Sequence, residues 1–143
     1  MDVETMRDLV ENYQSNTEKL ERLNQKLVAL MEYNLKITAT YSLAAARSEG
    51  TVNSKVENYA IRIRETEEKI FKVGNQISVV DIACRVLNNA ELEVIELIKK
   101  GYRNRVTKMA KILHKDKNYI VTKRDSAIKK MSEYIGDKYG KYV

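Results

Sequence analysis

The hydrophobic positions in the first half of the chain follow a heptad spacing. From residue 3 to about residue 46 they recur three and four positions apart, and the same spacing returns over residues 56–87. A second apolar column flanks the first stripe, so the pattern predicts two long helices that pack against more than one neighbour. The first stripe is Val3, Met6, Val10, Tyr13, Thr17, Leu20, Asn24, Leu27, Met31 and Asn34, and its flanking column is Leu9, Leu23, Leu30 and Ile37. The second stripe is Val56, Tyr59, Ile63, Thr66, Ile70, Val73, Ile77, Val80, Cys84 and Leu87.

A polar segment, residues 47–54, separates these two helices. Gly50 is expected to break the first helix, and Ser54 with Glu57 forms a capping box for the second. A short loop between two helices of similar length predicts an antiparallel hairpin over residues 1–87. Residues 77–87 are apolar around nearly the whole helix, which predicts a buried joint where the C-terminal domain or a second protomer packs.

Residues 88–143 show a different pattern, with three shorter helices. The first is expected to start near a cap at Asn89 and to end at Gly101, the usual left-handed terminator. Residues 106–113 then form a short amphipathic helix, a three-residue break follows, and a longer helix starts near Lys117 after an N-cap at Asp116. A short helix, a tight turn and a longer basic helix are typical of a DNA-binding helix-turn-helix.

The C-terminal helices resemble region 4 of the sigma-70 family and its phage relatives. The segments ELEVIELIKKG, KMAKIL and YIVTKRDSAIKKM carry the resemblance. His114 stands where that family prefers Gly, and the connection GYRNRVT is about one residue longer than usual. The matching positions are Glu91, Val94, Ile95, Leu97, Met109, Ala110, Leu113, Asp116, Ile120, Ala127, Ile128 and Met131.

Residues 54–70 resemble the central segment of RinA/ArpU-like phage transcription regulators, in the same order along the chain. An unrelated coiled-coil spacer is the alternative for this segment. Together the two resemblances imply a regulator of phage or prophage late genes in a bacterial host cell.

Composition and charge support an all-α DNA-binding protein. The chain has no Pro, five Gly and one Cys, and no apolar run approaches 18 residues, so we expect a cytoplasmic protein without a disulfide. Residues 97–143 hold 14 Lys and Arg against 4 Asp and Glu, a net charge of +10, whereas residues 1–96 hold 12 against 16, a net charge of −4. An ordinary solvated Lys-rich surface would not concentrate the charge on the predicted helix-turn-helix.

Catalytic chemistry has little support. One His, one Cys and no Gly-rich phosphate loop leave the roles of an enzyme site unfilled, so we expect no enzyme, no cofactor and no metal site.

The residues expected to contact DNA can be assigned instead. The expected base-reading residues, on the outer face of the second helix and its edges, are Lys117, Asn118, Tyr119, Val121 and Thr122. The expected phosphate contacts are Lys99, Lys100, Arg103, Arg105, Lys108, Lys115 and Lys123.

The sequence therefore predicts a long antiparallel helical hairpin (residues 1–87) followed by a helix-turn-helix domain (residues 88–143). The expected function is sequence-specific transcription control with double-stranded DNA and RNA polymerase as partners, in a homodimer. A small phage-encoded alternative sigma factor is one alternative, but residues 1–87 have one Phe, no Trp and a negative net charge, unlike a promoter-melting module. A structural or interaction coiled-coil protein is the alternative from another class.

Overall fold

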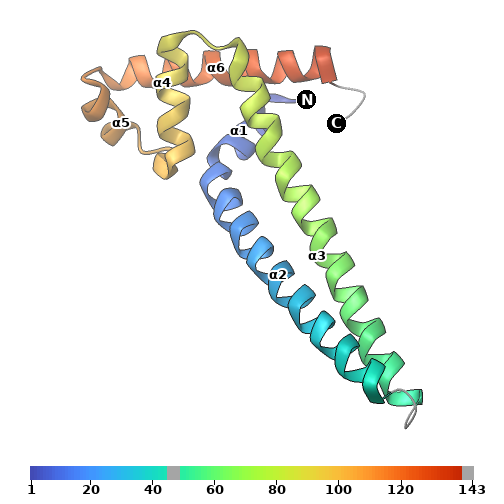
Figure 1. Ribbon diagram of the computed structural model, residues 1–143. Coiled ribbons are helices and arrows are strands. Elements are labelled where there is room, and N and C mark those ends of the chain that lie inside the picture. Colours follow the sequence, from blue (N-terminus) through green and yellow to red (C-terminus); the bar gives the residue numbers. More distant parts are fainter. Residues whose placement is uncertain (45–48, 140–143) are drawn as a thin grey trace. The chain divides into compact units, whose positions relative to one another are not determined.

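The computed structural model describes the backbone of residues 1–44 and 49–139 and the side chains of residues 1–39 and 55–137. Every regular element in these ranges is helical, so the predicted all-α class is confirmed (Figure 1). The elements in chain order are α1 (Val3–Glu11), α2 (Tyr13–Ala44), α3 (Glu49–Ala83), the 3-10 turn η1 (Cys84–Val86), α4 (Asn89–Leu97), the π-helical turn η2 (Ile98–Tyr102), α5 (Val106–Leu113) and α6 (Lys117–Tyr139). Within the described ranges, no helix is both long enough and apolar enough to cross a bilayer.

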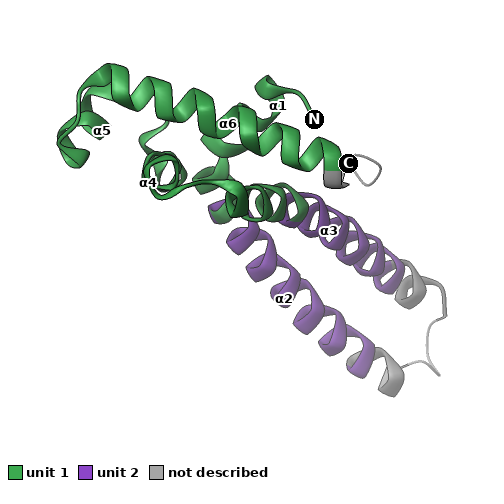
Figure 2. Cartoon of the chain, turned by 90° about the horizontal axis from the view of Figure 1, so that it is seen from above, with its two compact units in different colours: residues 1–17, 75–143 green, residues 18–74 purple. Residues whose placement is uncertain are grey.

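The chain forms two compact units (Figure 2). Unit 1 contains residues 1–17 and 75–143, and unit 2 contains residues 18–74. The sequence predicted a division at residue 87 instead. Residues 1–17 and 75–87, expected in the hairpin domain, thus group with the C-terminal helices.

The first predicted helix is interrupted at Asn12, so the expectation of one continuous helix over residues 3–46 is wrong. Asn12 has φ −93° and ψ 6°, and its N–H donates to the carbonyls of Asp8 and Val10. The interruption gives α1 its own packing role: Met6 and Val10 are fully buried, and α1 packs on α6. Burial of these two side chains explains why α1 belongs to unit 1.

The core of unit 1 joins α1, the end of α3, α4, α5 and α6. Val80 and Ala83 are fully buried in it, so the predicted buried joint at residues 77–87 packs within this unit. The remaining side chains of this core are Met6, Val10, Val94, Ile95, Leu97, Ile98, Met109, Ala110, Ile120, Ala127, Ile128, Met131 and Ile135.

Capping explains where α4 begins. The N-cap is Asn88 and not the predicted Asn89: its side chain accepts from the Glu91 N–H (2.9 Å) while Glu91 Oε1 accepts from the Asn88 N–H (3.2 Å). These two bonds form a reciprocal capping box, which a residue one position later could not close. Beyond α4 the helical path continues into η2, where Gly101 has φ 105°, as predicted for a left-handed terminator.

In unit 2, α2 and α3 run side by side in opposite directions (Figure 1). The centroids of the Tyr33 and Tyr59 rings lie 5.0 Å apart. The predicted α3 stripe is confirmed, with Thr66 and Val73 2% and 4% exposed. The α2 stripe is partly wrong, because Asn24 is exposed and Met31 is 45% exposed. Among the described side chains of α2 in unit 2, the partly buried residues are Leu20, Leu23, Leu27, Leu30, Asn34 and Ile37, so the column predicted as flanking belongs to the seam.

The connection between α2 and α3 is shorter than predicted. Because α3 begins at Glu49, Gly50 lies inside this helix and does not mark a break over residues 47–54. The predicted capping box of Ser54 and Glu57 involves a side chain outside the described residues.

Candidate nucleic-acid interface

The connection between α5 and α6 has the three residues that the sequence predicted, 114–116. His114 adopts the left-handed conformation (φ 55°, ψ 43°), and the Lys115 N–H donates to the Ala110 carbonyl at 3.0 Å. Asp116 then accepts from the Tyr119 N–H at 2.7 Å, which confirms the predicted N-cap of α6. These bonds satisfy backbone groups at the end of α5 and the start of α6, and thereby define the turn between them.

Helix α6 has one buried face and one exposed face over its first three turns. Ile120, Ala127 and Ile128 are at most 1% exposed, as the apolar spacing predicted. On the other side Lys117, Asn118 and Thr122 are exposed. The buried face fixes the rotation of α6 about its axis, so these polar side chains project into solvent.

The remaining two predicted base-reading residues are partly buried. Val121 lies between buried Ile120 and exposed Thr122, whereas the Tyr119 ring packs with two lysines of the same region. Lys115 Nζ lies 5.2 Å and Lys123 Nζ 5.6 Å from the Tyr119 ring centroid. A ring between two ammonium groups holds both cations near the start of α6.

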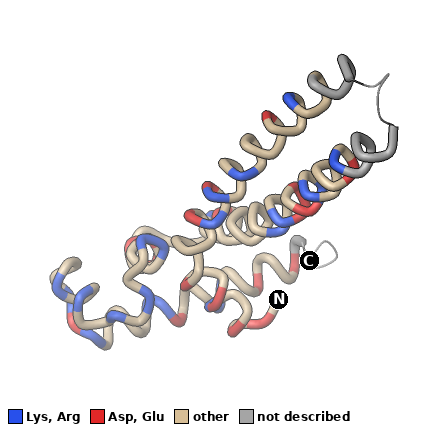
Figure 3. The backbone as a smooth tube through the Cα atoms, turned by 90° about the horizontal axis from the view of Figure 1, so that it is seen from below, with Lys and Arg blue, Asp and Glu red and all other residues tan. Residues whose placement is uncertain are grey.

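Most of the predicted phosphate contacts are exposed. Lys100, Arg103, Arg105, Lys108 and Lys115 are exposed, and Lys123 is half-buried. Figure 3 shows Lys and Arg along α5 and the start of α6. Residues 99–124 hold ten Lys and Arg against one Asp, a net charge of +9, so this part of unit 1 attracts anions.

Lys99 is the exception among the predicted phosphate contacts. Its Nζ lies 3.3 Å from both Asp81 and Glu96 and 4.5 Å from the centroid of the Tyr13 ring. Burial lowers the pKa of Lys99, but the neighbouring Cys84, Glu96 and Tyr13 raise it by more. The pKa of Lys99 therefore lies above its ordinary value. Lys99 therefore connects helices inside unit 1, and its ammonium group is engaged there and not directed to a phosphate.

The same cluster perturbs two further groups. Burial raises the pKa of the Tyr13 phenol, and the hydrogen bond that its hydroxyl donates to Asp81 (2.8 Å) raises it further. Burial raises the pKa of the Cys84 thiol, and this effect outweighs the lowering by the Lys99 charge, so that the pKa is about 11. Cys84 is thus a protonated, half-buried thiol at neutral pH, in line with its predicted packing role.

A second polar network positions α6 against α4. Glu91 is 1% exposed, and its carboxylate accepts from Ser126 Oγ (2.7 Å) and Lys130 Nζ (2.8 Å). Burial raises the pKa of Glu91, but the hydrogen bonds from Lys130, Ser126 and the Asn88 backbone outweigh it, so the pKa lies below its ordinary value. Glu91 matched the sigma-like pattern in the sequence; its contacts assign it a structural role.

Three cations of this region, Lys111, Arg124 and Arg7, are not among the predicted contacts. Lys111 is exposed one turn after Lys108 on the same face of α5, and its spacing was sufficient to find it. Arg124 Nε lies 3.2 Å from Asp125 Oδ1, to which Arg7 Nη2 of α1 also points at 4.0 Å. No sequence signal indicated that α1 contributes a cation here. Within the described side chains, no group of three or more His, Cys, Asp or Glu residues could hold a metal ion.

Comparisons with protein-family models, with curated proteins and with solved structures gave no match to this chain. The resemblance to sigma-70 region 4 and to RinA/ArpU-like regulators is therefore a hypothesis that rests on the residues alone.

Proposed function

We propose that the protein is a sequence-specific DNA-binding transcription regulator of phage or prophage late genes that acts with RNA polymerase in the bacterial cytoplasm. In this proposal α5, the three-residue turn and α6 form a helix-turn-helix, and the antiparallel α2–α3 pair is an interaction domain. The observation that best supports this proposal is the exposure of Lys117, Asn118 and Thr122 on the side of α6 opposite its buried residues. These three residues lie in a segment, residues 99–124, of net charge +9.

The assigned roles follow from side-chain chemistry. Asn118 can pair bidentately with adenine, Lys117 can donate to guanine acceptors, and Thr122 can contact a thymine methyl group in the major groove. Lys100, Arg103, Arg105, Lys108 and Lys115 surround this helix start in sequence and would bind phosphates. Phosphate contacts set the register on the duplex but carry no base information.

Direct DNA binding by the full chain tests the proposal. Selection from random duplexes should yield one preferred sequence, and its affinity in a fluorescence anisotropy titration should fall steeply with salt. The slope of log K against log salt should change by about 0.9 for each phosphate contact. Lys108→Gln should reduce that slope, whereas Arg85→Gln, an exposed cation outside the assigned set, should not. A chain that selects no sequence is the outcome expected of the alternative, a structural or interaction protein.

Dependence on a resident sigma factor distinguishes a regulator from an alternative sigma factor. A sigma must capture unpaired bases, usually on aromatic side chains. Residues 1–87 hold no Trp, one Phe and four Tyr, and of these Tyr13 is engaged with Asp81 and Lys99 inside unit 1. We therefore expect this protein to stimulate transcription by holoenzyme and to give no specific transcript with core polymerase alone. Specific initiation from core polymerase plus this protein would instead establish the sigma factor.

We also propose that the protein is a homodimer, with unit 2 as the contact between copies. Val28, Met31 and Leu35 are spaced three and four residues apart on α2 and are 55%, 45% and 68% exposed. That heptad spacing suits an identical helix from a second copy. Leu35→Asp should then convert a dimer into a monomer in sedimentation; a monomeric wild type at micromolar concentration would exclude the dimer.

A further inference from the structure

The charges of unit 2 are separated between two opposite sides of the helix pair. The inward-facing residues are those of the α2 and α3 stripes that face each other. Viewed from one end of the pair, one helix turns clockwise and its antiparallel partner turns counter-clockwise. The residues that precede the inward-facing ones by one position therefore lie on the same side of the pair in both helices. On that side are eight exposed cations and one carboxylate, Glu65. We call the eight cations the basic face of unit 2: Lys19, Arg22, Lys26, Lys36, Lys55, Arg62, Lys69 and Lys72.

The opposite side has the reverse character. The residues one position after the inward-facing ones include one cation, Arg64, and three carboxylates, Glu21, Glu57 and Glu67. Residues 18–74 as a whole hold ten Lys and Arg against eight Glu, a net charge of only +2. The basic face is therefore a local feature that the total charge conceals.

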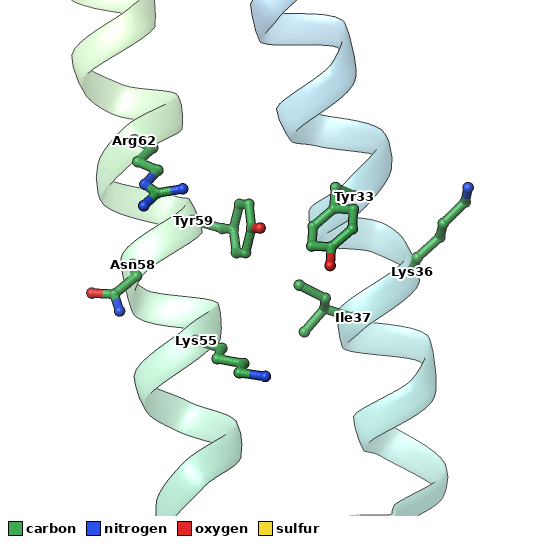
Figure 4. Close-up of a pocket in the computed structure, with 7 residues that line it drawn as sticks. All are labelled: Tyr33, Lys36, Ile37, Lys55, Asn58, Tyr59 and Arg62. Atoms are coloured by element: carbon green, nitrogen blue, oxygen red, sulfur yellow. The ribbon is translucent and has the colours of Figure 1, made fainter.

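A pocket of about 490 Å³ opens on the basic face (Figure 4). It is lined by Tyr33, Lys36 and Ile37 from α2 and by Lys55, Asn58, Tyr59 and Arg62 from α3. The Tyr33 and Tyr59 rings are tilted by 43°, and Arg62 Cζ lies 5.5 Å from the Tyr59 centroid. The described residues that line it include no Asp or Glu.

Lys55 and Arg62 carry like charges at this pocket, so an anion bound between them would lower their repulsion. Within the part of the chain that the structure describes, neither Lys55 nor Arg62 forms an ion pair. The cations extend over residues 19–36 of α2 and 55–72 of α3, about 25 Å along each helix at 1.5 Å per residue. A single small anion would neutralise only the pocket, whereas a regular polyanion would neutralise the whole face.

We infer that the basic face of unit 2, centred on the Tyr33–Tyr59 pocket, is a second nucleic-acid-binding surface that takes the phosphodiester backbone. The phosphates of a nucleic acid are closely spaced negative charges along its backbone, and this arrangement matches the two extended rows of cations. The Arg62 guanidinium and the tyrosine rings at the pocket can bind both the phosphate and the base of a nucleotide, whereas an isolated carboxylate would contact only the cations. This surface lies on a different unit from α6 and does not depend on the function proposed for that helix.

Lysine acetylation of the full chain separates the two surfaces. The probes are a 20-base-pair duplex, a 20-nucleotide single strand and polyglutamate of the same total charge. Lys55 should be protected by nucleic acid and not by polyglutamate, and the form that protects at the lower concentration identifies the nucleic acid. Protection of Lys117 alone would overturn this inference and leave the proposed function intact; protection of Lys55 alone would do the reverse.

Arg62 and Arg64 provide a matched pair of variants two residues apart on opposite sides of α3. Arg62→Gln should reduce the salt dependence of binding by about 0.9 in slope for one lost duplex contact, or about 0.7 for a single strand. Arg64→Gln should leave it unchanged, and both variants should keep the wild-type helical circular dichroism. Equal effects of the two variants, or equal protection of Lys55 by polyglutamate, would overturn the inference.

Discussion

Glu91 in the first turn of α4 and Lys130 of α6 form an ion pair of 2.8 Å across 39 residues of sequence. Glu91 is 1% exposed, whereas the Lys130 side chain is 46% exposed. The same carboxylate closes the α4 capping box and accepts from Ser126. One buried side chain thus starts one helix and holds the proposed DNA-reading helix against it.

We predict that Glu91→Gln destabilises the protein. The amide can still accept hydrogen bonds but loses the charge that faces Lys130, so the free energy of unfolding should fall by about 1–3 kcal/mol. Lys130→Gln should cost less, because Glu91 keeps its hydrogen bonds from Ser126 Oγ and the Asn88 N–H. Chemical denaturation of both variants measures the difference; a larger loss for Lys130→Gln would mean that the cation, and not these hydrogen bonds, holds the Glu91 carboxylate.

The pH dependence of this effect has a definite sign. The pKa of Glu91 is lowered in the folded protein, so its carboxylate contributes stability above the ordinary value of 4.5 and loses it as the pH falls through the folded pKa. The difference between wild type and Glu91→Gln should therefore be largest near neutral pH and shrink in acid. A constant difference down to about pH 3 would exclude this linkage.

Met6 tests the contribution of α1 to unit 1. Its side chain is fully buried against the C-terminal helices, so Met6→Ala should reduce the free energy of unfolding by about 2–5 kcal/mol. Ile61→Ala, at a side chain that is 50% exposed, is the control and should change it by less than about 0.5 kcal/mol. For the same reason residues 88–143 alone, without Met6, Val10, Val80 and Ala83, should not fold. A cooperative thermal transition of that fragment would refute the role of α1.

His114 carries a backbone strain that glycine would relieve. A left-handed conformation costs an L-residue about 1–2 kcal/mol, and the greater flexibility of unfolded glycine offsets part of that gain. His114→Gly should thus stabilise the protein by about 0.5–1 kcal/mol, whereas His114→Val should destabilise it. Thermal unfolding of the two variants decides; destabilisation by glycine would mean that the imidazole makes a necessary contact.

The two kinds of proposed DNA contact should respond differently to substitution. Asn118→Ala and Lys117→Ala should each relax discrimination at particular base pairs by about 1–3 kcal/mol. Lys108→Ala should weaken all sequences about equally. Competition against singly mutated binding sites measures both effects. A change of base preference in Lys108→Ala, with none in Asn118→Ala, would reverse the assigned orientation of α6.

The sequence alone determined the helical elements and several of their ends. Missing prolines and regular apolar spacing predicted helices throughout, and the short segment between Leu113 and Lys117 was located to the residue. The caps at Asp116 and Gly101 were also predicted correctly, because both depend on local backbone hydrogen bonding and conformation. Local interactions of this kind are encoded within a few neighbouring residues.

Only the tertiary structure decided which partner each helix face meets. Heptad spacing in α2 left two adjacent columns, and packing selected the one with Leu23 and Leu30 over the one with Asn24 and Met31. It also joined α1 to the C-terminal helices and engaged Lys99 with Tyr13 and Asp81, which lie far away in sequence. Periodicity specifies that a face is apolar, and charge specifies that a side chain needs a partner. Which surface satisfies either requirement depends on the packing of segments distant along the chain.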